Sequence, residues 1–331
     1  MSKLAIAAPH TFAGLTGLGA YRPERRVTND EVAVRIDSSD EWIRERSGIV
    51  ERRFAREDET AASMAAIAGA RALKDAGVAA ADVDLVIVAT FTHRHQTPSA
   101  AAEVAHLVGA TNAAAFDISA ACAGFCYGLG IADGLVRSGQ AHTVLLIGTE
   151  KLSDFINFDD RGTAFIFADG AGAVVIQETA EQGIGPTVWH ADGSAMDAII
   201  MKPDTVQSGR TNEPTQITME GQRVFRWAVG TMAEICEQAI EKSGISKSEL
   251  TAFVPHQANL RITKSILKSL ELPESVVVST DIEYSGNTSA ASIPLALDAL
   301  RSEGKVKSGD FILLVGFGAG LAYAAQVART P

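Results

Sequence analysis

Residues 72–88 read ALKDAGVAAADVDLVIV, and residues 239–255 read AIEKSGISKSELTAFVP. Each stretch contains the end of a helical pattern, then a glycine, then a short apolar run typical of a buried strand. Gly77 and Gly244 align with an offset of 167 positions, which is 244 minus 77. A helix–glycine–strand unit that recurs at this separation predicts a duplicated α/β unit of domain size.

Two further matches follow in the same order. The offset of 167 pairs Cys122 with Ser289, each near the start of a helix rich in small residues. An offset of one residue more pairs VLLIG at 144–148 with ILLVG at 312–316. Helix–glycine–strand units also recur in α/β proteins that contain no duplication, so this alternative stays open.

Short apolar runs alternate with longer helical patterns, which favours an α/β fold with much parallel sheet. Strands are predicted at residues 85–89, 144–148, 173–176, 252–255 and 311–316. Helices are predicted at residues 60–76, 121–138, 221–242, 261–270 and 292–302. We expect an N-terminal half at residues 1–180 and a C-terminal half at 181–331, related by a pseudo-twofold axis that brings helices 121–138 and 292–302 face to face. Residues 193–220 have no clear period and are interpreted as a long excursion, of a kind that forms lids or pocket walls or is disordered.

Composition excludes several classes of protein. The chain has 331 residues and a net charge of −11, which argues against general nucleic-acid binding. No apolar run approaches the roughly 18 residues of a membrane span, and the apolar residues 4–8 are too few for a signal peptide. Three cysteines without framework spacing favour a reducing, cytoplasmic location.

Cys122 lies in FDISAACAGF (116–125), where an apolar segment ends and a helix begins. The positive end of a helix dipole favours a thiolate, and the free amides of the first turn can hold a developing oxyanion. Cys122 is therefore a candidate nucleophile. The alternative is a small buried core residue, since free cysteines often have that role.

Two polar motifs in the C-terminal half are candidates for the same site. His256 in FVPHQANLR directly follows a predicted strand, at the strand end where α/β sheets bind ligands. Asn287 in YSGNTSAASIP precedes the helix at 292–302 and could donate its amide to a ligand. Capping or turn roles are the alternatives for both residues.

Two other motifs are interpreted as having no cofactor role. GFGAG at 316–320 has only 11 residues after it, too few for the βαβ unit and acidic residue of a dinucleotide site. His93 and His95 in THRH have no cysteine or carboxylate cluster beside them in the sequence. We expect neither a metal nor a bound cofactor.

Together, Cys122 in SAACAGF, His256 in VPHQAN and Asn287 in GNTSAASIP resemble the β-ketoacyl-acyl-carrier-protein synthase III family of the thiolase superfamily. The resemblance runs from YRPERRV at 21–27 to the C-terminal GFGAGLAYAAQVAR. It implies two βαβαβαββ halves in a five-layer αβαβα sandwich, and a homodimer. It also implies a condensation of an acyl-CoA primer with malonyl-acyl-carrier-protein, which starts fatty acid synthesis.

The resemblance implies a role for each residue of the site. Cys122 would attack the primer thioester, and its amide, with that of Ala319, would form the oxyanion hole. The sequence leaves open whether neighbouring Gly318 supplies the second amide instead. His256 and Asn287 would donate hydrogen bonds to the malonyl thioester oxygen. Phe317 would pack near the thiol.

The remaining matched positions concern substrate binding. The resemblance implies contacts with CoA for Trp42, Arg46, Arg161, Gly162, Asn259 and Arg261, with Trp42 and Arg161 on either side of the adenine ring. It implies docking of an acidic carrier protein by Arg226, Arg261, Lys264 and Lys268, the last three on one helix face. Thr97 would enter the acyl pocket of the partner subunit, where its small side chain leaves room for a branched or longer primer. Without the resemblance, the stretch DEWIRERSG at 40–48 and the basic helix face would each be interpreted as an ordinary solvated surface.

Other readings remain. A related synthase that loads an unusual starter in secondary metabolism would have the same triad. A degradative thiolase fits less well because no cysteine follows Cys236, and an elongating synthase fits less well because it uses two histidines where this chain has one and Asn287. A Cys/His/Asn thioester hydrolase would form the same acyl-enzyme, and an acyl-binding protein would need no reactive thiol.

Overall fold

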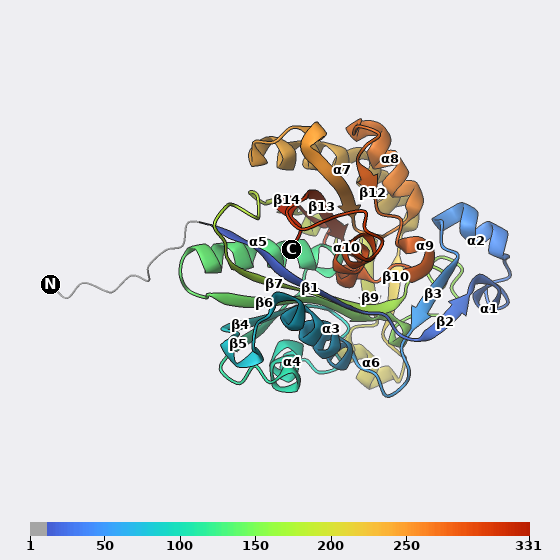
Figure 1. The fold of residues 1–331 in the computed structure, drawn as a ribbon. Helices are drawn as coiled ribbons and strands as arrows, with labels where there is room; N and C mark the ends of the chain where they lie inside the picture. Colours follow the sequence, from blue (N-terminus) through green and yellow to red (C-terminus); the bar gives the residue numbers. More distant parts are fainter. Residues whose placement is uncertain (1–11) are drawn as a thin grey trace.

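The computed structural model describes residues 12–331 (Figure 1). The apolar stretch at 4–8, interpreted above as too short for a signal peptide, lies outside the described residues. Among the helices of the described part, none combines the length and apolar character needed to cross a bilayer.

Two five-stranded sheets form the framework, and they share one topology. The first has the order β1-β7-β6-β4-β5, and the second has the order β8-β14-β13-β11-β12 when read from its other edge. In each sheet the three strands at one side are parallel and the two at the other side are antiparallel to their neighbours. The predicted duplication is therefore visible strand by strand.

The strands of the first sheet are β1 (Ala13–Tyr21), β4 (Leu85–Ala89), β5 (Ala114–Ile118), β6 (Thr143–Lys151) and β7 (Asp169–Glu178). Those of the second are β8 (Val188–Ala191), β11 (Leu250–Pro255), β12 (Val277–Val278), β13 (Phe311–Gly318) and β14 (Ala322–Arg329). The proposed boundary between residues 180 and 181 lies in the loop that connects β7 with β8. All five predicted strands are present, and several are longer than predicted.

Helices fill three layers, which with the two sheets make the five-layer αβαβα sandwich expected from the sequence (Figure 1). Helices α3 (Ala61–Ala76) and α4 (Ala100–Val108) cover the outer face of the first sheet. Helices α7 (Gly221–Ser243) and α8 (Leu260–Leu270) cover the outer face of the second. Helices α5 (Gly124–Arg137) and α10 (Ser292–Ser302) lie between the sheets, packed in one apolar core with residues of both.

The two glycines that revealed the repeat have the same structural role. Gly77 ends α3 with a φ of 68°, and Gly244 ends α7 with a φ of 70°. Both residues adopt the left-handed conformation that closes a helix and that glycine adopts without a Cβ penalty. The match at offset 167 therefore marks two equivalent helix ends.

The predicted pairing of Cys122 with Ser289 is wrong by one residue. The 3₁₀ turns that precede α5 and α10 span Ala121–Ala123 and Ser289–Ala291. Their first residues both have a positive φ, 43° at Ala121 and 51° at Ser289. The backbone turn thus aligns the halves at offset 168, and the equivalent of Cys122 is Ala290. Small side chains recur in both segments, so residue type alone did not fix the register.

The two halves meet through reciprocal contacts made by equivalent glycines. A Cβ added to Gly148 on β6 would lie 2.3 Å from the carbonyl oxygen of Ala290, in the turn before α10. A Cβ added to Gly316 on β13 would lie 3.0 Å from the carbonyl oxygen of Cys122, in the turn before α5. Each sheet therefore presses a glycine against the turn of the opposite half, as the expected pseudo-twofold arrangement requires. The two halves thus approach each other closely at these turns, which lie at the N-terminal ends of the central helices α5 and α10.

Smaller elements surround one end of the sandwich. A hairpin and two short helices are formed by β2 (Arg25–Thr28), α1 (Asn29–Ala33), α2 (Asp40–Ser47) and β3 (Glu51–Phe54). The excursion at 193–220 contains β9 (Ile199–Lys202), α6 (Thr205–Thr211) and β10 (Gln216–Met219), with β9 and β10 paired antiparallel. Helix α9 (Ile282–Ser285) precedes the turn that carries Asn287. The buried Arg52 on β3 ties this region together, since its guanidinium donates to Asn29 and to the carbonyl oxygen of Phe165.

Candidate active site

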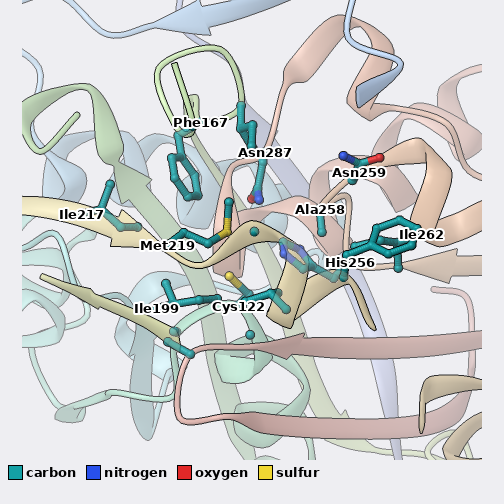
Figure 2. A pocket seen from close by; sticks show the side chains of 18 of the residues that line it. Cys122, Phe167, Ile199, Ile217, Met219, His256, Ala258, Asn259, Ile262 and Asn287 are labelled. Carbon is teal, nitrogen blue, oxygen red and sulfur yellow. The ribbon is translucent and has the colours of Figure 1, made fainter. Parts of the chain in front are cut away.

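Cys122, His256 and Asn287 line one cavity of about 980 Å³ (Figure 2). Cys122 comes from the turn between β5 and α5, His256 from the end of β11, and Asn287 from the segment between α9 and α10. The close-up shows the thiol, the imidazole and the carboxamide turned toward the same space. The structure thus brings together three residues that are far apart in the sequence.

Cys122 sits on a strained turn, directly after Ala121 with its φ of 43°. Gly318 packs against it so closely that an added Cβ would lie 2.9 Å from Sγ. Burial raises the pKa of the Cys122 thiol to about 12, against a lowering by the Ser289 hydroxyl and a further raising by the Glu150 charge. Desolvation of the charged form is the largest influence on this pKa, and it opposes the preference for a thiolate expected from the helix N-terminus.

His256 is held neutral in a fixed orientation. Burial lowers its pKa to about 3. Its Nδ1 is 2.7 Å from the Ser292 hydroxyl, which itself accepts the backbone N–H of Gln257 at 3.3 Å. A serine hydroxyl that accepts one bond and donates its proton to Nδ1 favours the tautomer that carries its hydrogen on Nε2. The imidazole ring packs edge-on against Phe317, with 5.3 Å between centroids.

Asn287 is oriented by the backbone on both sides. Its side-chain Oδ1 accepts the N–H of Ser289 at 2.9 Å, which leaves the donor atom Nδ2 for the cavity. Its main chain pairs with the segment that precedes β7, since Asn287 N donates to Ile166 O and Ala168 N donates to Asn287 O. His256 and Asn287 can thus both present N–H donors to one acceptor atom.

Both candidates for the second oxyanion-hole amide lie at the cavity. Gly318 and Ala319 line it at the end of β13, next to Cys122. The close contact of Gly318 with Sγ requires that position to lack a side chain. Phe317, before them on β13, also lines the cavity and is 2% exposed.

The residues predicted to bind CoA lie at the mouth of the same cavity. It is lined by Trp42, Arg46, Arg161, Gly162, Asn259 and Arg261. The Arg161 guanidinium lies 4.8 Å from the centroid of the Trp42 ring, and that of Arg46 lies 5.6 Å from it. Asn259 caps α8 by accepting the Arg261 N–H and donates to the Arg46 carbonyl oxygen. An aromatic ring beside two guanidinium groups suits a planar, negatively charged ligand.

Four basic side chains extend outward from this mouth. Arg226 on α7 and Arg261 at the start of α8 line the cavity, whereas Lys264 and Lys268 lie farther along α8. All four are exposed, and within residues 12–331 none of them forms an ion pair. They form a local basic surface on an acidic protein, which we call the α8 basic surface.

Two sequence predictions concern the loop at 92–99, which lies away from the cavity. Thr97 is exposed and does not line the cavity of its own chain, so its role toward a partner subunit stays a prediction. The sequence argument against a metal at His93 and His95 was that no cysteine or carboxylate cluster accompanies them, and the structure places one carboxylate beside them. Glu103 on α4 joins them, with one possible ligand atom of each residue within 4.8 Å of the others. Sequence spacing missed it because Glu103 is brought near by the turn into α4.

Sequence reasoning also missed the apolar wall of the cavity. The excursion at 193–220 supplies residues that pack around the space beside Cys122: Ile199, Ile200, Met201, Ile217 and Met219. Phe165, Ile166 and Phe167 also line the cavity and pack in one apolar cluster with Ile217, Ile199 and Met219. Figure 2 shows Phe167 close to Asn287. The runs IIMK and QITM mark the paired strands β9 and β10, and their apolar side chains were the available signal.

Two family models match the chain: 3-oxoacyl-[acyl-carrier-protein] synthase III at residues 116–193, and the C-terminal domain of the same family at 240–330. A β-ketoacyl-[acyl-carrier-protein] synthase III from Streptomyces glaucescens is 50% identical over 334 residues, covering 100% of both chains. A mycobacterial β-ketoacyl-[acyl-carrier-protein] synthase III from Mycobacterium tuberculosis is 52% identical, covering 100% of this chain and 99% of the relative.

Solved structures give the same result. The priming β-ketosynthase of the R1128 polyketide biosynthetic pathway has a TM-score of 0.97 and 45% identity, covering 100% of this chain and 99% of the other. The 3-oxoacyl-[acyl-carrier-protein] synthase III of Aquifex aeolicus has a TM-score of 0.89 and 41% identity, covering 96% of this chain and 100% of the other.

Proposed function

The chain belongs to the 3-oxoacyl-[acyl-carrier-protein] synthase III family, and we propose that it joins a short acyl-CoA primer to malonyl-acyl-carrier-protein. It is a condensing acyltransferase with the thiolase fold. The reaction gives a 3-oxoacyl-acyl-carrier-protein, CoA and carbon dioxide, and it starts fatty acid biosynthesis. The observation that carries the proposal is the convergence of Cys122, His256 and Asn287 on one cavity with an aromatic and basic mouth.

In the loading step, Cys122 attacks the carbonyl carbon of the primer thioester. The amide of Cys122 and that of Ala319 or Gly318 hold the oxyanion of the tetrahedral intermediate. CoA leaves, and the acyl group stays on Sγ as a thioester. Trp42 and Arg161 bind the adenine ring of CoA in this proposal, and Arg46, Gly162, Asn259 and Arg261 line the path of the pantetheine arm and phosphates.

In the condensation step, malonyl thioester loses carbon dioxide and becomes an enolate. His256 Nε2 and Asn287 Nδ2 donate to the thioester oxygen, where negative charge develops. A neutral imidazole suffices for this, which agrees with the lowered pKa of His256. The enolate carbon then attacks the acyl group on Cys122, and Cys122 leaves as a thiolate.

The other assignments of the proposal concern partners and location. The α8 basic surface docks the acidic carrier protein, and the protein acts as a homodimer in which Thr97 reaches the partner's acyl pocket. The reaction needs no cofactor beyond its substrates. The three free cysteines support the reducing, cytoplasmic location predicted from the sequence.

A starter-unit synthase of secondary metabolism is the second candidate function. The observation in its favour is the likeness to the priming β-ketosynthase of a polyketide pathway, which extends over the whole chain. Both functions use the same chemistry at Cys122, His256 and Asn287. They differ in the primer and in the carrier protein that accepts the product.

Intact-protein mass spectrometry separates these functions. The protein is incubated with a panel of straight and branched short acyl-CoAs, and malonyl-acyl-carrier-protein is then added. We expect one acyl mass on Cys122 that is discharged as a 3-oxoacyl product only when the malonyl substrate is present. Cys122→Ala should give no adduct, and Asn287→Ala should load normally but condense about 100-fold more slowly. Discharge to water without malonyl substrate would indicate a hydrolase, and the absence of any adduct would indicate a binding protein.

Primer preference and carrier-protein choice distinguish the two condensing functions. Faster turnover with the carrier protein of fatty acid synthesis supports the proposal. Faster turnover with a carrier protein of a polyketide pathway would support the second function. Thr97 is tested in the same panel, since loading of acetyl alone would contradict a pocket enlarged by a small side chain.

A further inference from the structure

A buried carboxylate that the mechanism above does not use lies beside the nucleophile. Glu150, near the end of β6, is fully buried, and its charge is one of the influences on the Cys122 thiol. Four donors converge on its Oε2: the hydroxyls of Thr90 and Thr92 at 3.0 and 2.6 Å, and the backbone N–H groups of Phe91 and Thr92 at 3.3 and 3.2 Å. Oε2 is thereby fixed as an acceptor.

The second oxygen of Glu150 has a different environment. Within residues 12–331, Oε1 is buried and has no partner at ordinary hydrogen-bond geometry, and the same is true of the Ser289 hydroxyl. Each of these unpaired atoms is costly to bury, so their presence at the site needs a reason. Because Oε2 is saturated with donors, Oε1 is the atom of Glu150 that can take up a proton.

Ser289 connects Glu150 with Cys122. Burial raises the pKa of each group and the Ser289 hydroxyl lowers both, although it forms no hydrogen bond of ordinary geometry to either. The turn that carries Ser289 contacts β6 two residues before Glu150, where a Cβ added to Gly148 would lie 2.3 Å from the Ala290 oxygen. Ser289 is held at a φ of 51° in the turn before α10, and its N–H is bonded to Asn287 Oδ1. In an enzyme without substrate, hydrogen bonds that act in catalysis are often long or poorly aligned, which agrees with the open geometry around this hydroxyl.

Burial raises the pKa of Glu150 to about 8, so it can both accept and release a proton near neutral pH. His256 is a poor acceptor by comparison, because burial lowers its pKa to about 3. Lys151, the adjacent residue, does not compensate the carboxylate, since its Nζ donates to the carbonyl oxygens of Arg56 and Glu59. The groups that face Glu150 are Thr90, Phe91 and Thr92 after β4, and Ser289 before α10. None of them is charged.

Resting on the proposed loading step, we propose that Glu150 accepts the Cys122 proton through the Ser289 hydroxyl while Cys122 attacks the primer. The Cys122 proton moves to Ser289 Oγ, and the Ser289 proton moves to Glu150 Oε1. The Sγ–carbon bond forms, the bond from carbonyl carbon to CoA sulfur breaks, and the proton returns from Glu150 to the departing CoA thiolate. In condensation Cys122 leaves as a thiolate and takes up one proton from solvent. Glu150 is thus a positioning residue, because it acts on the Cys122 proton through Ser289.

Alkylation of Cys122 by iodoacetamide tests this relay without acyl-CoA or carrier protein. The rate is followed by mass spectrometry from pH 6 to 9.5 for the wild type, Glu150→Gln and Ser289→Ala. The relay predicts a bend near pH 8 in the wild type and its loss in both variants, with rates at pH 8 at least about tenfold lower. It also predicts a solvent deuterium isotope effect above 1 in the wild type that disappears in Ser289→Ala. The double variant, with both Glu150→Gln and Ser289→Ala, should be alkylated no more slowly than either single variant. Both substitutions interrupt the same proton path.

A purely electrostatic role for Glu150 gives opposite results. Removing its negative charge would then speed alkylation in Glu150→Gln, and Ser289→Ala would keep the bend near pH 8. Either outcome overturns the relay, as does a bend that disappears only in His256→Gln. Asp169→Asn is the control for loss of a buried carboxyl, since Asp169 on β7 bonds Ser153 and Ala55 instead. Ser285→Ala is the control for loss of a buried hydroxyl, which there donates to Asp281 O.

The rate of primer loading, measured by rapid quenching, should likewise be higher in the wild type than in Glu150→Gln and Ser289→Ala. If the wild type is alkylated as predicted but no acyl-CoA loads it, the proposed function fails and the relay stands. If loading occurs with unchanged rates in Glu150→Gln and Ser289→Ala, the relay fails and the proposed function stands. Near-UV circular dichroism of each variant confirms that the fold is retained.

Discussion

At Cys122 and His256, burial acts in one direction and favours the uncharged form of each side chain. The free enzyme therefore holds a thiol and a neutral imidazole side by side, and not a preformed ion pair. In the proposed mechanism, negative charge reaches the space between these two side chains only with the substrate, first as an oxyanion and then as an enolate. Donors that are already fixed in place, such as Asn287 with its Oδ1 held by Ser289, would stabilise that charge without reorganisation.

The lowered pKa of His256 makes a prediction for stability. The unfolded chain takes up a proton on this histidine as pH falls through about 6.5, whereas the folded state does not until about pH 3. The unfolded state then binds more protons, so the free energy of unfolding falls with decreasing pH, by up to about 1.4 kcal/mol per pH unit. His256→Gln should lose this part of the slope.

Urea unfolding at pH 7.5, 6.5 and 5.5 measures the slope. The exposed His190→Gln is the matched control and should keep the pH dependence of the wild type. An unchanged slope in His256→Gln would contradict a neutral, buried histidine in the folded state.

At the scale of single residues, sequence and structure agree on which groups meet but not on their charge. Motifs identified Cys122, His256 and Asn287, because chemistry limits which residue types can do this work. Glu150 gave no signal, since one glutamate at the end of a predicted strand looks like any surface carboxylate. Its burial and its link to Ser289 depend on the opposite half of the chain.

Among the secondary-structure elements, the glycines of β6 and β13 determine how closely the halves approach. Gly148→Ala would place a Cβ 2.3 Å from a backbone oxygen of the turn before α10, which cannot move without shifting Asn287 and Ser289. Gly316→Ala would make milder contacts of 3.0 Å with the turn that carries Cys122. We expect Gly148→Ala to lower the free energy of unfolding by about 3 kcal/mol, with a smaller loss for Gly316→Ala.

Gly134→Ala on α5 provides the control for this prediction. An added Cβ there has no heavy atom within 4 Å, so removing a helical glycine should stabilise the protein by up to about 1 kcal/mol. Chemical denaturation of the three variants checks the order. Equal stability of Gly148→Ala and the wild type would show that the turns do not pack as described.

Elements with a clear apolar period were predictable, whereas an alanine-rich strand and two short strands were not. The five predicted helices are all present within two or three residues, with the first turn of one formed as a 3₁₀ turn. β14, with the sequence AYAAQVAR, was missed because alanine carries little strand signal, although it lies buried between β13 and β8. β9 and β10 were missed because each is only four residues long and they pair across an intervening helix.

For the molecule as a whole, the surface beside the cavity mouth has a charge opposite to the net charge of the chain. The chain carries a net charge of −11, yet the α8 basic surface lies beside the cavity mouth. In the proposed function, the net negative charge would repel an acidic carrier protein and the α8 basic surface would attract it, which would orient its approach.

Charge reversal on α8 tests this steering. Lys264→Glu with Lys268→Glu should raise KM for malonyl-acyl-carrier-protein about tenfold and leave loading from acyl-CoA within about twofold, because neither lysine lines the cavity. The effect should shrink as salt screens the charges. Lys74→Glu on α3, an exposed lysine on the outer layer of the other half, is the control and should leave both steps unchanged. A loss of loading equal to the loss of condensation would contradict docking.

The reciprocal packing of Gly148 and Gly316 has a consequence for recombination between relatives. Gly316 of the C-terminal half packs against the turn that carries Cys122, and Gly148 of the N-terminal half packs against the turn that follows Asn287. A chimera that joins halves from two parents therefore alters the support of a nucleophile whose own segment is untouched. Two parents can therefore exchange pockets only if their residues match where these glycines contact the turns of the opposite half.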